Sequence, residues 1–233
     1  MIELFPEGFE EADAGDDVEF AAYTDSSGEE RLWHAFGGAR AADVENGWEE
    51  RWRSFHRPVT VGPLWVGPPW ETPPADSLAI VIGPGRAFGT GAHATTRLSL
   101  ELLLDLPRGP LLDIGCGSGV LAIAAARLGF APVVALDIDP LAIEATRGNA
   151  AANGVEVEVL LRDAVHEPLP ATSTAVANIA LGAVADLAVR LDCDRLVTSG
   201  YLVSDPLALP GYMRLRRLDG EGWAADLWEP ESE

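Results

Sequence analysis

The stretch LLDIGCGSGVLAIAAARLG, from Leu111 to Gly129, decides the fold. It opens with a short apolar run that is typical of a buried strand, and it closes with an Ala- and Leu-rich segment that is typical of a helix ended by Gly129. The loop DIGCGSG lies between them, where a strand must turn directly into a helix. Glycines at such a point permit positive φ and let a ligand approach the backbone closely. The stretch therefore predicts a strand, a glycine loop and a helix, with room for a ligand at the loop.

The same alternation of strands and helices continues toward the C-terminus. One predicted helix has Asp139 as its N-cap, Pro140 in its first turn and Gly154 at its end. The tail instead predicts a hairpin around Asp219-Gly220. Further strands are predicted in the segments 132–139, 155–163, 173–179 and 194–202. This order predicts an α/β fold with a mostly parallel sheet, helices on both faces and an antiparallel C-terminal hairpin.

We predict three parts along the chain. Residues 1–57 form a small acidic α+β module, with short strands before residue 38 and a helix from Ala42 to His56. Residues 58–77 are rich in proline and tryptophan and form a stiff connector, since helix interiors do not tolerate proline. Residues 78–233 form the larger domain that holds the glycine loop.

Composition indicates a soluble, cytoplasmic protein. The 233 residues are 48% hydrophobic, enough for a sizeable core. No apolar run reaches the roughly 18 residues of a membrane-spanning helix, and the acidic start lacks the features of a signal peptide. Cys116 and Cys193 make neither a disulfide framework nor a zinc motif.

The net charge of −21 argues against nucleic-acid binding, which needs a basic face. The first fifty residues hold fifteen Asp or Glu against two Arg. Such a surface attracts a basic partner, because a field of one sign raises encounter rates. A biased composition with a solvated acidic surface is the alternative interpretation.

A carboxylate follows the glycine loop at the spacing found in nucleotide-binding βαβ units. Asp137 ends the next predicted strand, 22 residues beyond Gly115. A carboxylate there accepts hydrogen bonds from the two hydroxyls of a ribose, so the pair predicts an adenosine-containing cofactor. A dinucleotide loop requires the spacing G-x-G-x-x-G, whereas the glycines here stand at 115, 117 and 119. A glycine turn without a ligand is the alternative.

The D-x-G-x-G-x-G form of the loop resembles methyltransferases that use S-adenosylmethionine. Asp163 follows a predicted strand at the place where that superfamily often has an acidic residue near the adenine amine. The alternative, to which we give equal weight, is that Asp163 is a turn residue at the end of the strand.

Asn178 ends another predicted strand, in VANIAL. Ligands bind at the carboxyl edge of an open parallel sheet, and an amide oxygen there can orient a target amine. A turn-forming Asn is the alternative.

The segment AFGTGAHATT, from Ala87 to Thr96, contains His93 without any second ligand at metal spacing, so no metal site is predicted. His93 is either a general base, since imidazole titrates near neutrality, or a polar residue that fixes the loop.

This segment, the glycine loop, ALDIDPLAIEATRGNAAANGV and VANIALGAVADLA together closely resemble the PrmA-type ribosomal protein methyltransferases, over roughly Trp48 to Gly200. The resemblance implies a Rossmann-like class I methyltransferase fold with a seven-stranded sheet. It implies S-adenosylmethionine as cofactor and, as substrate, lysine or N-terminal amines of a ribosomal protein, large-subunit protein L11. The N-terminal domain is short by comparison with the family.

The resemblance assigns cofactor contacts to this chain, with Asn178 also orienting the amine. The predicted contacts are Thr96, Gly115, Asp137 and Asn178, together with Gly117, Phe88 and Asp163. Two other functions remain open: a related methyltransferase that acts on another protein or a small molecule, and a non-catalytic module that keeps the fold.

Overall fold

The computed structural model describes residues 10–13, 18–21, 57–83 and 91–231. The chain divides into two units, Met1–Trp52 and Arg53–Glu233. In the first, β1 (Glu10–Asp13) pairs antiparallel with β2 (Val18–Ala21), in keeping with the predicted strands. The helix predicted for 42–56 lies outside the described residues.

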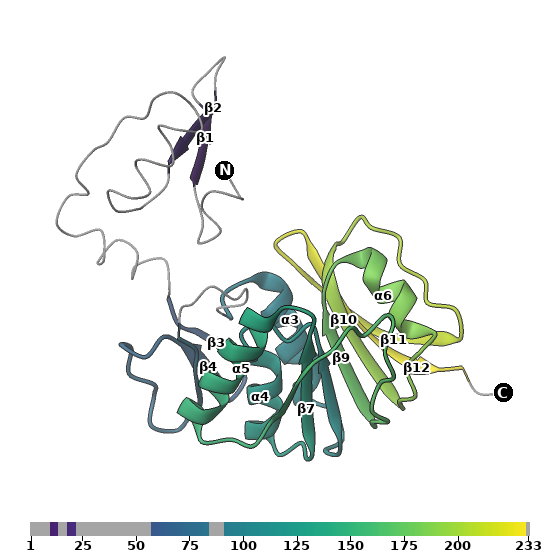
Figure 1. Ribbon diagram of the computed structural model, residues 1–233, viewed down its shortest axis with the longest axis horizontal. Helices are drawn as coiled ribbons and strands as arrows, with labels where there is room; N and C mark the ends of the chain where they lie inside the picture. Colours follow the sequence, from purple (N-terminus) through teal and green to yellow (C-terminus); the bar gives the residue numbers. More distant parts are fainter. Residues whose placement is uncertain (1–9, 14–17, 22–56, 84–90, 232–233) are drawn as a thin grey trace. The chain divides into compact units, whose positions relative to one another are not determined.

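The second unit alternates strands and helices after a short run of strands (Figure 1). Its elements are β3 (Val59–Val61), β4 (Leu64–Gly67), β5 (Leu78–Val81), α3 (Ala94–Leu104), β6 (Leu111–Ile114), α4 (Val120–Leu128), β7 (Val133–Asp137), α5 (Pro140–Asn153), β8 (Glu158–Leu161), β9 (Thr174–Asn178), α6 (Leu181–Ala188), β10 (Arg195–Leu202), β11 (Tyr212–Gly220) and β12 (Trp223–Pro230).

Seven strands form the central sheet, in the order β11-β12-β10-β9-β6-β7-β8. The strands from β10 to β8 run parallel, while β12 pairs antiparallel with both β10 and β11. This confirms the predicted α/β fold with its antiparallel C-terminal hairpin. The chain runs outward from β6 to β8 and then returns to β9 on the other side of β6, so the order reverses between β6 and β9. In open parallel sheets a crevice forms at the carboxyl ends of the strands at such a point.

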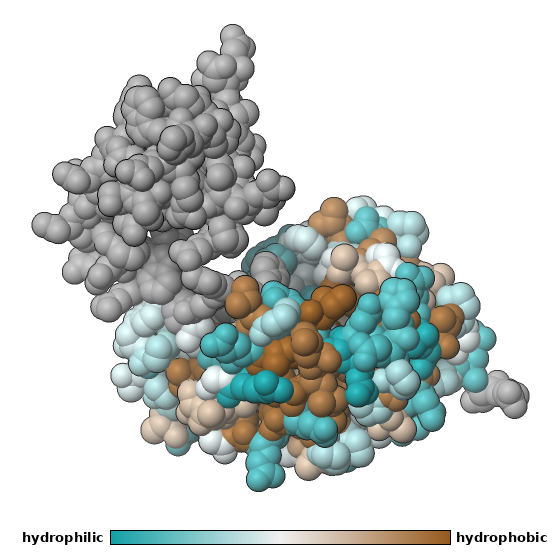
Figure 2. Space-filling model, in the orientation of Figure 1, coloured by the Kyte–Doolittle hydropathy of each residue, from teal (hydrophilic) through white to brown (hydrophobic). Residues whose placement is uncertain are grey.

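Helices cover both faces of this sheet (Figure 1). On one face α3, α4 and α5 lie in a row, and the side chains of α3 and α4 share a core with Leu111. On the other face Leu187 of α6 packs on Leu112 and Ile114. Neighbouring residues of β6 thus enter opposite cores, because successive side chains of a strand point to opposite faces. On the surface of this unit, Figure 2 shows hydrophobic residues gathered at the centre of the visible face, with hydrophilic residues on either side.

The ends of α4 and α5 agree with the sequence. Gly129 ends α4 in the left-handed conformation, with φ of 94°. The Asp139 side chain caps α5 by accepting from the Leu141 N–H, Pro140 occupies the first turn, and Gly154 ends the helix with φ of 61°. These boundaries depend on neighbouring residues alone, which is why the sequence predicts them.

The predicted connector is wrong for its first half. Residues 59–67 form β3 and β4, and β4 pairs parallel with β5, so this segment belongs to the second unit. Pro63 occupies the turn between β3 and β4, and Pro68 follows β4. Proline is tolerated at turns and strand ends, so these prolines bound short strands instead of stiffening a linker. The two units divide after Trp52, close to the predicted end of the first module at residue 57, and residues 58–77 belong to the second unit.

The turn of the C-terminal hairpin also lies elsewhere. Gly220 pairs with Trp223, so the turn residues are Glu221 and Gly222, with φ of 53° and 82°. Two positive φ values match the twist of a two-residue hairpin turn. The observed register places Leu218 opposite Ala225, whereas a turn at Asp219-Gly220 would place Leu218 opposite Glu221.

Candidate functional site

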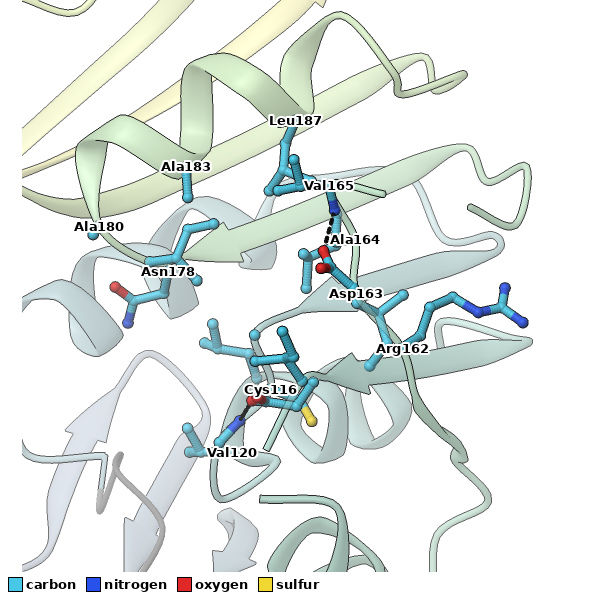
Figure 3. A pocket seen from close by; sticks show the side chains of 18 of the residues that line it. Cys116, Val120, Arg162, Asp163, Ala164, Val165, Asn178, Ala180, Ala183 and Leu187 are labelled. Carbon is cyan, nitrogen blue, oxygen red and sulfur yellow. Dashed lines mark hydrogen bonds between the residues drawn. The ribbon is translucent and has the colours of Figure 1, made fainter. Parts of the chain in front are cut away.

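A cavity of about 450 Å³ opens at the carboxyl ends of β6, β7 and β9 (Figure 3). Residues from the glycine loop, the ends of these strands, the segment after β8 and helix α6 line it. Its apolar lining consists of Ile114, Val120, Leu121, Leu136, Ile138, Ala164, Val165, Ile179, Ala180, Ala183 and Leu187. The cavity therefore lies where the strand order reverses, as expected for an open parallel sheet.

The glycine loop forms one wall of the cavity. Gly115, Gly117 and Gly119 all have positive φ, of 72°, 54° and 81°. A Cβ on Gly115 would collide with the side chain of Ile179, and a Cβ on Gly119 would stand 2.8 Å from Thr146 Cγ2. Backbone conformation and close packing thus both require glycine at 115 and 119.

Asp137 ties the end of β7 to this loop. Its Oδ2 accepts from the Gly117 N–H at 3.0 Å, and its Oδ1 accepts from the Asp139 N–H at 3.0 Å. An ionised carboxylate has about four acceptor positions, so both oxygens keep capacity for a further donor. The structure therefore brings the predicted carboxylate and the predicted glycine loop together at one rim of the cavity.

Asn178 and Thr96 meet on another side of the cavity. Asn178 Nδ2 lies 3.4 Å from Thr96 Oγ1 and donates to it. Thr96 lies in the first turn of α3 and is buried. Because the amide nitrogen is engaged with Thr96, Asn178 Oδ1 is the atom left to accept from a ligand. The two residues are 82 positions apart in the sequence.

Asp163 lies across the cavity from Asn178 (Figure 3). Its Oδ1 accepts from the Val165 N–H at 2.9 Å, and its Oδ2 lies 2.7 Å from His166 Nδ1. The hydrogen bond to His166 and the backbone donor of Val165 lower the pKa of this carboxyl. Asp163 is thus a turn residue that also lines the cavity. Its predicted contact with an adenine amine stays a prediction.

His93 caps helix α3. Its Nδ1 lies 2.8 Å from Thr95 Oγ1 and accepts from the Thr95 N–H at 3.4 Å. Its ring meets Trp223 edge to face, with centroids 4.8 Å apart. These contacts support the loop-fixing interpretation, and His93 is not among the residues that line the cavity. Phe88, the remaining predicted contact, lies outside the described residues.

A second carboxylate lies behind the loop without reaching the cavity. Asp113 on β6 is 1% exposed, and its Oδ2 accepts from the Ala122 N–H at 3.0 Å. Burial raises the pKa of this carboxyl to about 7, and the nearby charge of Asp137 adds to the effect, while the hydrogen bond from Ala122 opposes it. Two carboxylates thus lie near the glycine loop: Asp137 lines the cavity, whereas Asp113 is buried and does not.

Helix α6 and the residue before it contribute an apolar wall to the cavity that was not predicted from the sequence. Ala180, Ala183 and Leu187 line the cavity at spacings of three and four. That spacing is visible in ALGAVADLA and marks one helix face, but only the packing of α6 beside β9 turns this face toward the cavity. Polar side chains of α5 that bind the glycine loop were likewise not predicted.

Two further properties concern the described residues only. None of their helices is both long and apolar enough to cross a membrane. Among them, no group of three or more His, Cys, Asp and Glu side chains could hold a metal ion.

Comparison with known proteins identifies the family. A family model described as "Ribosomal protein L11 methyltransferase (PrmA)" matches residues 16–205. A ribosomal protein L11 methyltransferase from Symbiobacterium thermophilum is 44% identical over 151 residues, which are 61% of this chain and 49% of that protein. One from Aliivibrio fischeri is 37% identical over 188 residues, or 78% of this chain and 62% of that protein.

Among solved structures, the crystal structure of ribosomal protein L11 methylase from Lactobacillus delbrueckii subsp. bulgaricus matches with a TM-score of 0.68 and 26% identity. The match covers 76% of this chain and all (100%) of that chain, and it confirms the class I methyltransferase fold. The chain spans about half the length of the curated relatives it matches, with 49% and 52% of two of them covered. With more than half of its residues matched by the family model, the chain belongs to the ribosomal protein L11 methyltransferase (PrmA) family.

Proposed function

We propose that the cavity binds S-adenosylmethionine and that the chain transfers its methyl group to amines of a ribosomal protein. The hydrogen bond between Asp137 and the Gly117 N–H is the observation that carries this proposal, because it joins a ribose-type acceptor to a glycine cradle. The relatives are named for ribosomal protein L11, which makes that protein the proposed substrate.

The residues present fit this cofactor. Because Gly115 and Gly117 have no side chains, a ligand in the cavity can approach the backbone of the loop. Asp137 can still accept hydrogen bonds from ribose hydroxyls. The mostly apolar remainder of the cavity suits an uncharged purine, and Asp163 offers an acceptor at its far end for an exocyclic amine. Thr96 supplies a hydroxyl beside Asn178 for the amino-acid end of the ligand.

When bound, S-adenosylmethionine supplies a methyl group that its sulfonium has already activated. The protein's own part is orientation, desolvation and exclusion of water. Asn178 Oδ1 accepts a hydrogen bond from the incoming amine. This contact orients the amine so that the lone pair of its nitrogen points toward the methyl group. A lysine amine has a pKa of about 10.4 in water, and the apolar lining lowers it so that the neutral amine is available. A role for His93 as general base stays a prediction beside its observed capping contacts.

We infer that the substrate is basic and that the acidic residues of the first fifty positions help to attract it. By the same charge argument we expect no direct binding to nucleic acid. A ribosomal substrate and two free, buried cysteines suit a cytoplasmic protein.

Isothermal titration with S-adenosylmethionine tests the cofactor assignment. We expect Asp137→Asn to raise the dissociation constant at least about tenfold, because a charged acceptor is replaced by a neutral one. Glu144→Gln, an exposed carboxylate on α5, is the matched control and should bind as the unaltered chain does. Failure of the unaltered chain to bind, or equal binding by Asp137→Asn, would refute the assignment.

Transfer of labelled methyl groups tests the substrate. Label in ribosomal protein L11 from a set of purified ribosomal proteins would support the proposal. Label only in another protein or a small molecule of a cell extract would favour the related-methyltransferase alternative. Cofactor binding without any transfer would favour a non-catalytic module.

A further inference from the structure

Helix α5 presents a row of polar side chains to the glycine loop and to strand β5. Thr146, Asn149 and Asn153 stand three and four residues apart, which places them on one face of the helix. Thr146 is fully buried (0% exposed), and Asn153 is 5% exposed. Buried polar groups of this kind are retained where they satisfy specific partners.

Two of these side chains bind carbonyl groups of the glycine loop. Thr146 Oγ1 donates to the Gly117 carbonyl at 2.9 Å, and Asn149 Nδ2 donates to the Ser118 carbonyl at 2.9 Å. Asn149 Oδ1 also accepts from the Gly83 N–H at 3.1 Å. One amide thus holds both the glycine loop and Gly83, two residues after the end of β5, to the same turn of α5.

Asn153 makes the comparable contacts away from the cavity. Its Oδ1 accepts from the Val81 N–H at 2.8 Å, while its Nδ2 donates to the Val81 carbonyl at 2.7 Å and to the Asn149 carbonyl at 2.8 Å. It therefore holds strand β5, and none of these three hydrogen bonds reaches the glycine loop. Both asparagines donate and accept backbone hydrogen bonds through their side-chain amides, but Asn149 binds the glycine loop and Asn153 binds β5.

The glycine loop has a physical need for such restraint. Glycine populates positive and negative φ about equally, so a loop with three glycines in five residues has many accessible conformations. In a planar trans peptide the carbonyl and the following N–H point to opposite sides. A carbonyl held toward α5 thus keeps its oxygen away from the cavity. Ordering the loop before the ligand arrives removes part of the entropy cost of binding.

We propose that Asn149, assisted by Thr146, is a positioning residue for the cofactor site, holding the Gly117–Ser118 carbonyls toward α5 so that the loop stays open to the ligand. The inference rests on the proposed function, since the ligand is S-adenosylmethionine. Asn149 contacts no reacting atom, and its effect is on affinity through the loop.

Matched substitutions at 149 and 153 test this role by isothermal titration with S-adenosylmethionine below the melting temperature. Asn149→Asp keeps the acceptor for Gly83 and turns the donor for Ser118 into an oxygen that repels its carbonyl, so we expect an affinity about tenfold lower. Asn153→Asp makes the same chemical change and should lower the melting temperature while leaving the dissociation constant within about twofold. Equal affinities for Asn149→Asp and the unaltered chain, or an equal loss in both variants, would overturn the proposal.

A second pair at Thr146 keeps the test decisive if Asn149→Asp does not fold. Thr146→Val retains the shape and removes the donor to Gly117, and Thr146→Ser retains the donor and removes a methyl group. We expect the valine variant to bind about fivefold more weakly, with faster amide hydrogen exchange across residues 115–119 in the free protein. The serine variant should bind normally although it is less stable, because its small cavity costs stability alone. The reverse pattern would show that packing, not the donor, matters.

The readouts separate this inference from the proposed function. An unaltered chain that does not bind S-adenosylmethionine refutes both. An unaltered chain that binds, together with Asn149→Asp and Thr146→Val variants that bind equally well, refutes only the positioning role.

Discussion

At the scale of single residues, burial separates two carboxylates that lie near the same loop. Asp137 is partly exposed at the end of β7 and keeps acceptor capacity toward the cavity. Asp113 lies on the adjacent strand, is almost fully buried and has one backbone donor, from Ala122. Both occur in the sequence as Asp beside a predicted loop, so their opposite surroundings arise from strand pairing and helix packing.

Asp113 makes the stability of the fold depend on pH. Its pKa of about 7 in the fold exceeds the ordinary value of 3.8, so the folded chain binds this proton more tightly than the unfolded chain does. The stabilisation that protonated Asp113 gives the fold is present in full below about pH 4 and is lost as the pH rises to about 7. It amounts to about 1.4 kcal/mol for each unit by which the pKa is raised. Asp113→Asn has no such proton, so it should gain stability relative to the unaltered chain between about pH 5 and pH 8.

Urea denaturation of both proteins at the two pH values measures this difference. Groups that titrate elsewhere act equally in both chains and cancel in the comparison. Parallel stability curves for the two chains would contradict a protonated Asp113 in the fold.

At the scale of elements, two glycines of α5 are expected to respond oppositely to the same substitution. Gly148 lies within the helix, and Gly154 ends it with φ of 61°; a Cβ on either would meet nothing within 4 Å. Gly148→Ala should stabilise the fold by about 0.5–1 kcal/mol, because alanine favours the helix. Gly154→Ala should destabilise it by about 1 kcal/mol, because alanine disfavours the left-handed region.

Thermal unfolding of the two variants checks these signs. Neither glycine lines the cavity, so the affinity for S-adenosylmethionine should be unchanged in both. A stabilised Gly154→Ala would show that the end of α5 does not adopt the left-handed conformation.

The hairpin of β11 and β12 shows where element-scale prediction stops. The Asp-Gly pair at 219–220 is a strong turn signal, yet the chain turns at Glu221-Gly222. Either turn suits the local sequence. The pairing of β12 with β10, where Leu196 stands opposite Trp228, sets the register of β12, so the local turn preference of Asp219-Gly220 does not decide where the chain turns.

At the scale of the whole molecule, charge is the property that no single element explains. A net charge of −21 should accelerate encounters with a basic protein. We expect kcat/KM for ribosomal protein L11 to fall severalfold between about 0.02 M and 0.2 M salt, since the Debye length shortens. Binding of S-adenosylhomocysteine, which carries no net charge, should change by less than about twofold and serves as the control. An activity on ribosomal protein L11 that is insensitive to salt would contradict electrostatic attraction of the substrate.

The site shows how far sequence reasoning reaches. Gly115, Gly117, Asp137, Asp163 and Asn178 were all predicted, and all line one cavity. The reason is topological: the carboxyl ends of parallel strands meet at one edge, so residues that follow predicted strands converge there. Their roles as ligand contacts remain proposals for the titrations above to test.

By itself the sequence determined the features that depend on near neighbours: the strands β6 to β10, the helices α4 and α5 with their ends, and the glycine–carboxylate spacing. Only the tertiary structure decided that residues 59–67 join a sheet, that the ring of His93 packs on Trp223, and that Asn149 holds the glycine loop. Helix caps and glycine turns are governed by local backbone energetics, which depend only on the residues of a short segment. Asn149, by contrast, makes hydrogen bonds with Ser118 and Gly83, which are 31 and 66 positions away in the sequence. Such contacts form only when the whole chain packs.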